Sequence, residues 1–116
     1  MGTFTVQVTF EGPQGQLNVD ALVDTAATYP VVPAAALRSI GVQPSGRRGF
    51  RLADEARVEY EVGSVDLLYE GERVPVLVVF GDDAASPLLG ATALENLSLA
   101  VDMRNQRLTP VDALMK

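Results

Sequence analysis

The residues best suited to chemistry lie where an apolar run ends on an acid. The stretch reads Ala21-Leu22-Val23-Asp24-Thr25-Ala26-Ala27. Asp24 would emerge where a packed strand gives way to a turn, beside a short hydroxyl that can donate or accept a hydrogen bond. The two alanines leave room for a substrate backbone to approach. Asp24 is therefore a candidate acid–base residue, and an aspartate that only caps a turn is the alternative interpretation.

The composition removes most other hydrolytic machinery. The 116 residues include no cysteine and no histidine. This excludes thiol nucleophiles, thiolate or imidazole metal ligands, and Ser–His or Cys–His pairs. Carboxylates, hydroxyls and lysine remain for hydrolysis. The elimination favours a pair of carboxylates that acts on water, and we expect no metal and no cofactor.

A second stretch, Leu88-Leu89-Gly90, follows later in the chain. With it, the sequence resembles the retropepsin-like aspartic proteases, the single-domain bacterial and retroviral relatives of pepsin. That family has two apolar residues, Asp, Thr or Ser, Gly and Ala in its catalytic loop, and two apolar residues and Gly before its C-terminal helix. Residues 22–27 and 88–90 match these motifs in order. The resemblance covers nearly the whole chain.

The resemblance implies an all-β fold, a closed β-barrel of the retropepsin (acid protease) type with a flap hairpin and one or two short helices. Residues 1–116 would form one domain. It also implies an aspartic-type endopeptidase. Asp24 is the one aspartate followed by Thr or Ser and then a small residue, so the second carboxylate must come from another copy. We therefore expect a homodimer in which two carboxylates share a proton.

The family's functional residues carry over to two groups in this chain. Asp24 and Thr25 are the expected catalytic residues, with Thr25 bonding to the opposite loop. The expected substrate-binding residues are Ala26, Ala27, Thr28, Tyr29, Ala53 and Asp54.

The sequence departs from the family's pattern in two respects. Ala26 stands where the family usually has Gly, which would matter if the loop needed a positive φ there. Thr28 and Ala91 stand where retroviral members tend to have an Asp and an Arg that pair. Both partners are replaced together, so no orphan charge remains. The departure at Ala26 keeps open a catalytically weak or inactive dimeric module that binds or scaffolds peptides.

Periodic patterns predict the elements around Asp24. Residues 4–10 and 17–23 alternate apolar and polar side chains on either side of the turn at 12–15, which predicts a hairpin that ends at Asp24. Residues 34–40 predict a short helix, with the preceding proline as an early helical residue and the next glycine as its stop.

Residues 50–52 and 57–62 flank a polar tip, Ala53-Asp54-Glu55-Ala56, and predict another hairpin. In the family this hairpin is the flap, which closes over a bound peptide and excludes water. A plain surface hairpin is the alternative. The segment before it, residues 43–49, contains an arginine pair and is predicted to be a solvated loop without a function.

The rest of the chain is predicted to be structural. Residues 65–69 and 74–80 predict two strands, the second buried on both faces. Residues 81–87 predict a loop whose acids are solvated rather than metal-binding. Thr92 and Glu95 have capping-box spacing in a helix after Gly90. Residues 99–103 and 107–111 predict a last hairpin.

Charge and hydropathy limit the partners. Nine basic and fifteen acidic residues give a net charge of −6, which disfavours nucleic acid. The longest apolar run, residues 74–80, is too short to cross a bilayer, and the N-terminal residues lack the pattern of a secretory signal. We expect a soluble cytoplasmic protein whose partners are a peptide or protein substrate and a second copy, with no nucleic acid and no membrane.

Overall fold

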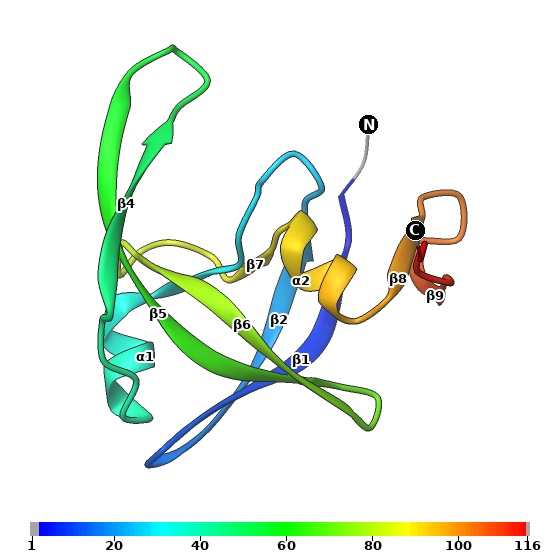
Figure 1. Ribbon diagram of the computed structural model, residues 1–116, viewed down its shortest axis with the longest axis horizontal. Helices are drawn as coiled ribbons and strands as arrows, with labels where there is room; N and C mark the ends of the chain where they lie inside the picture. Colours follow the sequence, from blue (N-terminus) through cyan, green and yellow to red (C-terminus); the bar gives the residue numbers. More distant parts are fainter. Residues whose placement is uncertain (1–2, 116) are drawn as a thin grey trace.

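The computed structural model describes residues 3–115 (Figure 1). Along these residues the elements are β1 (Thr5–Gly12), β2 (Gly15–Val23), β3 (Val31–Pro33), α1 (Ala34–Ser39), β4 (Gly46–Arg51), β5 (Arg57–Tyr69), β6 (Glu72–Gly81), β7 (Leu88–Leu89), α2 (Ala91–Asn96), β8 (Leu99–Asp102) and β9 (Arg107–Pro110). The architecture is all-β with two short helices, as the sequence predicts.

The main sheet closes on itself. Its strand order is β1-β2-β7-β3-β6-β5-β4, and β1 also pairs with β5. This extra pairing joins the first strand of the order to the next-to-last one and closes a ring, so that β4 alone among these strands lies outside it. β8 and β9 form a separate two-stranded sheet, at the right in Figure 1.

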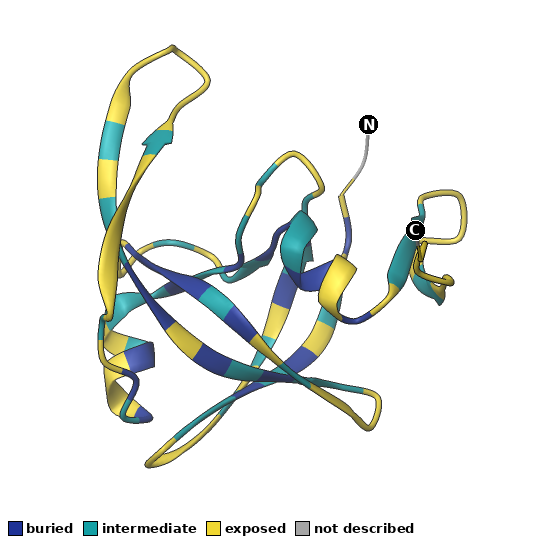
Figure 2. Ribbon diagram, in the orientation of Figure 1, coloured by how far each residue is buried: buried dark blue, intermediate teal, exposed yellow. Residues whose placement is uncertain are grey.

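The core is filled by the side chains that strand alternation turns inward. Val8 and Phe10 of β1 are buried, as are Ala21 and Val23 of β2. Buried and more exposed residues alternate in the same way along the middle of β5 (Figure 2). Because successive side chains of a strand point to opposite faces, this period places one face of each strand in the core. The predicted first hairpin is confirmed, with residue-by-residue pairing from Thr5–Leu22 to Gly12–Gly15.

The short strand β7 fixes the connection that carries Asp24. It pairs in parallel with β2, where Leu22 lies opposite Leu88, and antiparallel with β3, where Val31 lies opposite the same residue. The chain therefore leaves β2 on one side of β7 and returns on the other. We call the connection between them, residues 24–30, the Asp24 loop.

A long hairpin projects from the ring beside this loop, at the upper left in Figure 1. β4 pairs with β5 from Gly46 opposite Val62 to Arg51 opposite Arg57. We call β4, the turn at residues 52–56 and residues 57–62 of β5 the flap hairpin. The predicted hairpin is confirmed, but the prediction of a loop over residues 43–49 is wrong from Gly46 onward. The cross-strand bonds to β5 make a strand of a segment that its two glycines mark locally as a turn.

Two further local predictions are corrected. Pro33 has φ −52° and ψ 136°, so it ends β3 and caps α1 rather than entering the helix. The capping box of Thr92 and Glu95 does not form, because Gly90 is the N-cap residue of α2 and no side chain bonds to the cap. The backbone N–H of Thr92 is instead bonded outside the helix, in the contact described below.

β5 is one strand where the sequence suggested two. It runs through Gly63 and Ser64 without a break. A Cβ at Gly63 would lie 2.7 Å from the carbonyl oxygen of Gln43, so glycine here permits a close approach of two backbones. In the described part of the chain, no helix has the length and apolar character needed to cross a membrane.

Candidate active site

Asp24 is held by backbone bonds at the end of β2. Its N–H donates to the carbonyl oxygen of Leu89 at 3.1 Å, which ties it to β7. Its Oδ1 accepts a bond from the N–H of Ala26 at 3.0 Å. The residue is half-buried. The carboxylate therefore has a defined orientation, with one oxygen satisfied by the loop and the rest of its acceptor capacity available to other groups.

The start of α2 forms backbone hydrogen bonds with the Asp24 loop. The N–H groups of Ala91 and Thr92 donate to the carbonyl oxygens of Ala27 and Thr28, at 2.8 and 2.9 Å. These are N–H groups that the first turn of a helix cannot pair internally. The loop therefore gains two hydrogen bonds that hold it in place, and the helix end is satisfied at the same time.

Gly90 explains why the second motif must end on glycine. A Cβ at this position would lie 2.7 Å from backbone atoms of Thr28 and Tyr29. Real Cβ atoms do not approach backbone so closely, so any other residue would push the loop away from α2. Residues 22–27 and 88–90, which are far apart in the sequence, thus belong to one packed unit.

The backbone at Ala26 accommodates its side chain. In residues 3–115 the non-glycine residues with positive φ are Glu55, Glu70, Ser98 and Gln106. Ala26 is not among them, so an alanine in place of the family's glycine causes no left-handed strain. Thr25 and Ala26 are both exposed.

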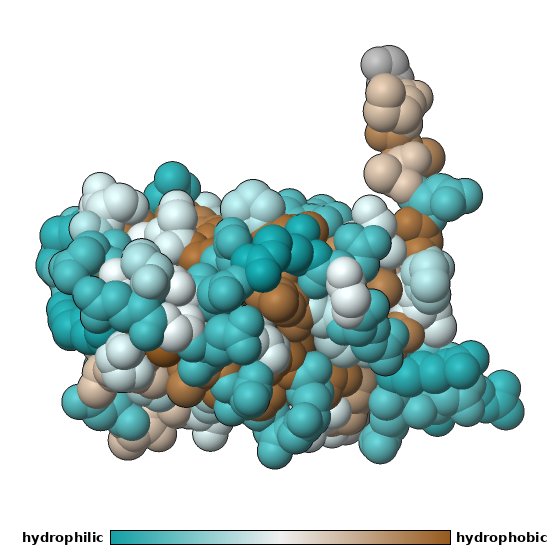
Figure 3. All heavy atoms as spheres, turned by 90° about the horizontal axis from the view of Figure 1, so that it is seen from below, coloured by the Kyte–Doolittle hydropathy of each residue, from teal (hydrophilic) through white to brown (hydrophobic). Residues whose placement is uncertain are grey.

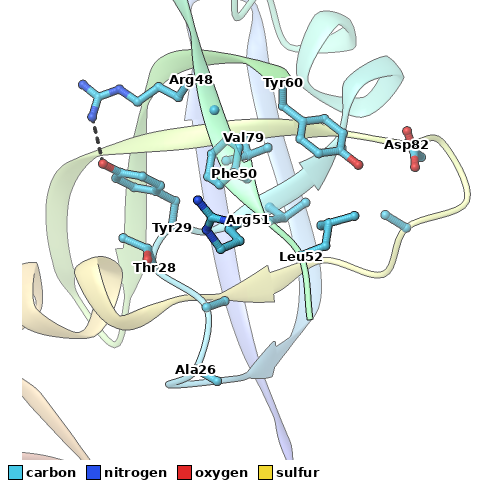
Figure 4. A pocket seen from close by; sticks show the side chains of 15 residues that line it. Ala26, Thr28, Tyr29, Arg48, Phe50, Arg51, Leu52, Tyr60, Val79 and Asp82 are labelled. Carbon is cyan, nitrogen blue, oxygen red and sulfur yellow. Dashed lines mark hydrogen bonds between the residues drawn. The ribbon is translucent and has the colours of Figure 1, made fainter. Parts of the chain in front are cut away.

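A pocket of about 700 Å³ opens between the Asp24 loop and the flap hairpin (Figure 4). Its walls come from residues 26–29 of the loop, residues 48–52 of the flap hairpin, Tyr60 of β5, Val79 of β6, and Asp82 in the loop after β6. Four of the expected substrate-binding residues, Ala26 to Tyr29, thus share one cavity.

Ala53 and Asp54 lie elsewhere. They belong to the exposed turn of the flap hairpin, and the carboxylate of Asp54 accepts a bond from the N–H of Ala56 at 3.0 Å. That bond shapes the turn, and neither residue lines the pocket. Across residues 3–115 no group of three or more Asp and Glu residues is placed to hold a metal ion.

An aromatic cluster that the sequence analysis did not foresee forms one side of the pocket. The ring of Phe50 lies edge-on to Tyr29 at 6.1 Å between centroids and edge-on to Tyr60 at 5.9 Å. Arg48 donates to the hydroxyl of Tyr29 at 2.9 Å. The expectation of a loop is wrong for Arg48, which lies in β4 and lines the pocket, although its side chain is exposed, as predicted. Residues 46–51 read Gly-Arg-Arg-Gly-Phe-Arg and show no alternation of apolar and polar side chains that would have marked this face.

The structure is similar to solved retropepsins. Simian foamy virus (mac) protease matches with a TM-score of 0.58 and 18% identity over 80% of this chain and 93% of that chain. EIAV protease, solved with the inhibitor HBY-793, matches with 0.57 and 22% over 83% and 88%. The retroviral protease-like domain of Ddi1 from Leishmania major matches with 0.57 and 19% over 96% and 90%.

No protein-family model and no curated protein matches the sequence. The structural likeness at 18 to 22% identity shows the fold, which is retropepsin-like. It confirms the fold that the motifs predicted.

Proposed function

We propose that this protein is an aspartic endopeptidase whose active site forms between two identical chains. One observation carries the proposal. In a retropepsin-like fold, the loop bearing Asp24 and Thr25 is fixed at the strand end by β7 and α2, beside a pocket of peptide-binding size. Residues 26–29 of that loop line the pocket, and Asp24 and Thr25 directly precede them without lining it. A carboxylate of defined orientation near a cavity is the arrangement that acid–base hydrolysis needs.

The second carboxylate is proposed to come from a two-fold symmetric partner. The exposed Thr25 and Ala26 leave the outer face of the loop open to the same loop of another copy. Thr25 of each chain would then bond to the opposite loop and hold the two Asp24 side chains together. Such a pair shares one proton, because like charges at that distance cannot both ionise.

The shared proton gives each carboxylate a role. The unprotonated Asp24 accepts a proton from water as the water oxygen attacks the scissile carbonyl carbon. The protonated Asp24 donates its proton to the carbonyl oxygen. When the tetrahedral intermediate collapses, the C–N bond breaks, the departing nitrogen takes the proton that the first Asp24 accepted from water, and a hydroxyl of the intermediate returns a proton to the second Asp24. The pair again holds one proton, and because water is the nucleophile, no covalent enzyme intermediate forms. Activity is expected at mildly acidic pH, where the pair holds one proton.

The experiment is a digest of denatured-protein peptides followed by mass spectrometry, between roughly pH 4 and 7, the range in which a shared-proton pair works. Wild type is compared with Asp24→Asn and with Asp20→Asn, a matched change four residues earlier on an exposed part of β2. Cuts made by wild type and Asp20→Asn but not by Asp24→Asn are the expected result. Cleavage that survives in Asp24→Asn would refute the assignment.

The alternative is a dimeric peptide-binding or scaffolding module with weak or no catalysis. The alanine at position 26 favours it, since its methyl group narrows the substrate path relative to glycine. If wild type cuts nothing while dimeric, Ala26→Gly separates the two functions. Activity gained in Ala26→Gly would show that the side chain blocks an otherwise complete site, and continued inactivity would support the binding module.

A further inference from the structure

One contact joins the flap hairpin directly to the Asp24 loop. A guanidinium nitrogen of Arg48 on β4 donates to the phenol oxygen of Tyr29 at 2.9 Å, shown as the dashed line in Figure 4. The same guanidinium lies 5.7 Å from the centroid of the Tyr29 ring, within range of a cation–π interaction. Phe50 meets the other part of this ring edge-on. Tyr29 therefore contacts Arg48 through its hydroxyl group and Phe50 through its ring, and both of these residues lie on β4.

Neighbouring arginines on β4 have different partners. Arg47 pairs with Glu59 at 3.5 Å, within the flap hairpin itself. In residues 3–115 Arg48 has no carboxylate partner within ion-pair distance, and the bond to Tyr29 takes that place. Adjacent residues of a strand face opposite sides, so Arg48 and Phe50 share the face toward the loop and Arg47 faces away.

Apart from the continuation of β5 into the ring, the flap hairpin has one ion pair with another element among residues 3–115, between Glu61 and Arg38 of α1 at 3.1 Å. Among the described strands β4 pairs with β5 alone, and it lies outside the closed ring. Its position over the loop therefore depends on side-chain contacts. The Arg48–Tyr29 contact lies at one edge of the pocket, so any movement of the hairpin away from the loop must break it before the cavity can widen.

We propose that Tyr29 and Arg48 form a clasp that holds the flap hairpin over the Asp24 loop and sets the width of the pocket. Both are positioning residues, since they act through the flap hairpin and not on the reacting atoms. The clasp itself is a property of the folded chain. Its effect on peptide binding rests on the proposed function.

Hydrogen–deuterium exchange of the free protein tests the clasp without any substrate. Tyr29→Phe removes the hydroxyl and keeps the ring, Arg48→Gln removes the guanidinium, and Arg47→Gln is the matched control on the opposite face. The amides of residues 49–57 are expected to exchange about fivefold faster in the first two variants, the factor that one hydrogen bond contributes. Arg47→Gln should leave their exchange unchanged.

A double variant makes the test specific. If the two residues act through one bond, Tyr29→Phe adds no further effect to Arg48→Gln. Unchanged exchange in Tyr29→Phe, or equal acceleration in Arg47→Gln, would overturn the clasp. For active protein, the KM for a peptide should rise about fivefold in both clasp variants and stay unchanged in Arg47→Gln. Inactive protein with clasp-dependent exchange would refute the endopeptidase and leave the clasp standing.

Discussion

Gly90 shows how one residue determines the position of the loop that follows Asp24. The absent side chain lets the start of α2 lie against the backbone of Thr28 and Tyr29, and the two N–H groups that follow bond to the loop. Without that approach, Asp24 would keep its bond to Leu89 but lose the support beneath the rest of the loop. Leu88-Leu89-Gly90 therefore supports the loop after Asp24 by close packing and backbone hydrogen bonds.

Gly90→Ala is expected to destabilise the protein by about 1–3 kcal/mol, the usual cost of forcing an added group into packed backbone. Urea unfolding followed by circular dichroism measures the change. Gly46→Ala is the control, because no atom lies within 4 Å of a Cβ at that position. Its effect should stay within about 0.5 kcal/mol. Equal stability of the two variants would show that the loop does not rest on α2.

The elements differ in how far the sequence alone could predict them. The first hairpin follows from alternation within adjacent segments, and its turn is marked by Gly and Pro. The start of β4 was missed because pairing with β5 overrides the local turn signal of Gly46 and Gly49. The contact of Arg48 with Tyr29 joins a strand to a distant loop. No local pattern contains that information, because it depends on the closed ring.

The hairpin of β8 and β9 has a pH-sensitive turn. Hydrogen bonds from Asn105, through its side chain and its backbone, hold the pKa of Asp102 below the ordinary value, and Arg107 adds to the effect. A lowered pKa stabilises the folded state above the unfolded pKa. The contribution is lost as the pH falls through the folded pKa.

Asp102→Asn should therefore be less stable than wild type at pH 7. The difference should begin to shrink as the pH falls below about 4, the ordinary pKa of aspartate, and should disappear below the lower pKa of the folded state. Urea unfolding at a series of pH values measures it. Asp112→Asn is the control, since it changes an exposed aspartate just beyond β9. A stability difference that stays constant from pH 7 to the acid limit would contradict the assigned charge interaction.

At the scale of the whole molecule, the C-terminal segment extends away from the body as a largely apolar strip (Figure 3). Leu114 and Met115 are 87% and 94% exposed. The separate β8–β9 sheet from which this segment continues has no third strand among the described residues. Exposed apolar side chains beside an unpaired sheet favour contact with another chain. We expect a second copy to cover them in the proposed homodimer.

Changing Leu114 and Met115 together to Ser should weaken the dimer about tenfold or more, because burial of each apolar side chain contributes to association. Sedimentation equilibrium measures the dissociation constant. The control exchanges the two side chains, Leu114→Met with Met115→Leu, and keeps the apolar area. An unchanged dissociation constant in the Ser variant would show that this segment lies outside the interface.

In the proposed enzyme each active site contains one Asp24 from each of the two chains. The most direct test of this arrangement is to refold wild type together with a roughly ninefold excess of Asp24→Asn and to measure peptide cleavage at a fixed amount of wild type. Random pairing leaves about one tenth of the wild-type chains with a wild-type partner, so cleavage should fall to about one tenth. Co-refolding with Asp20→Asn instead should raise it. Cleavage that is unchanged by excess Asp24→Asn would contradict a site shared between two chains.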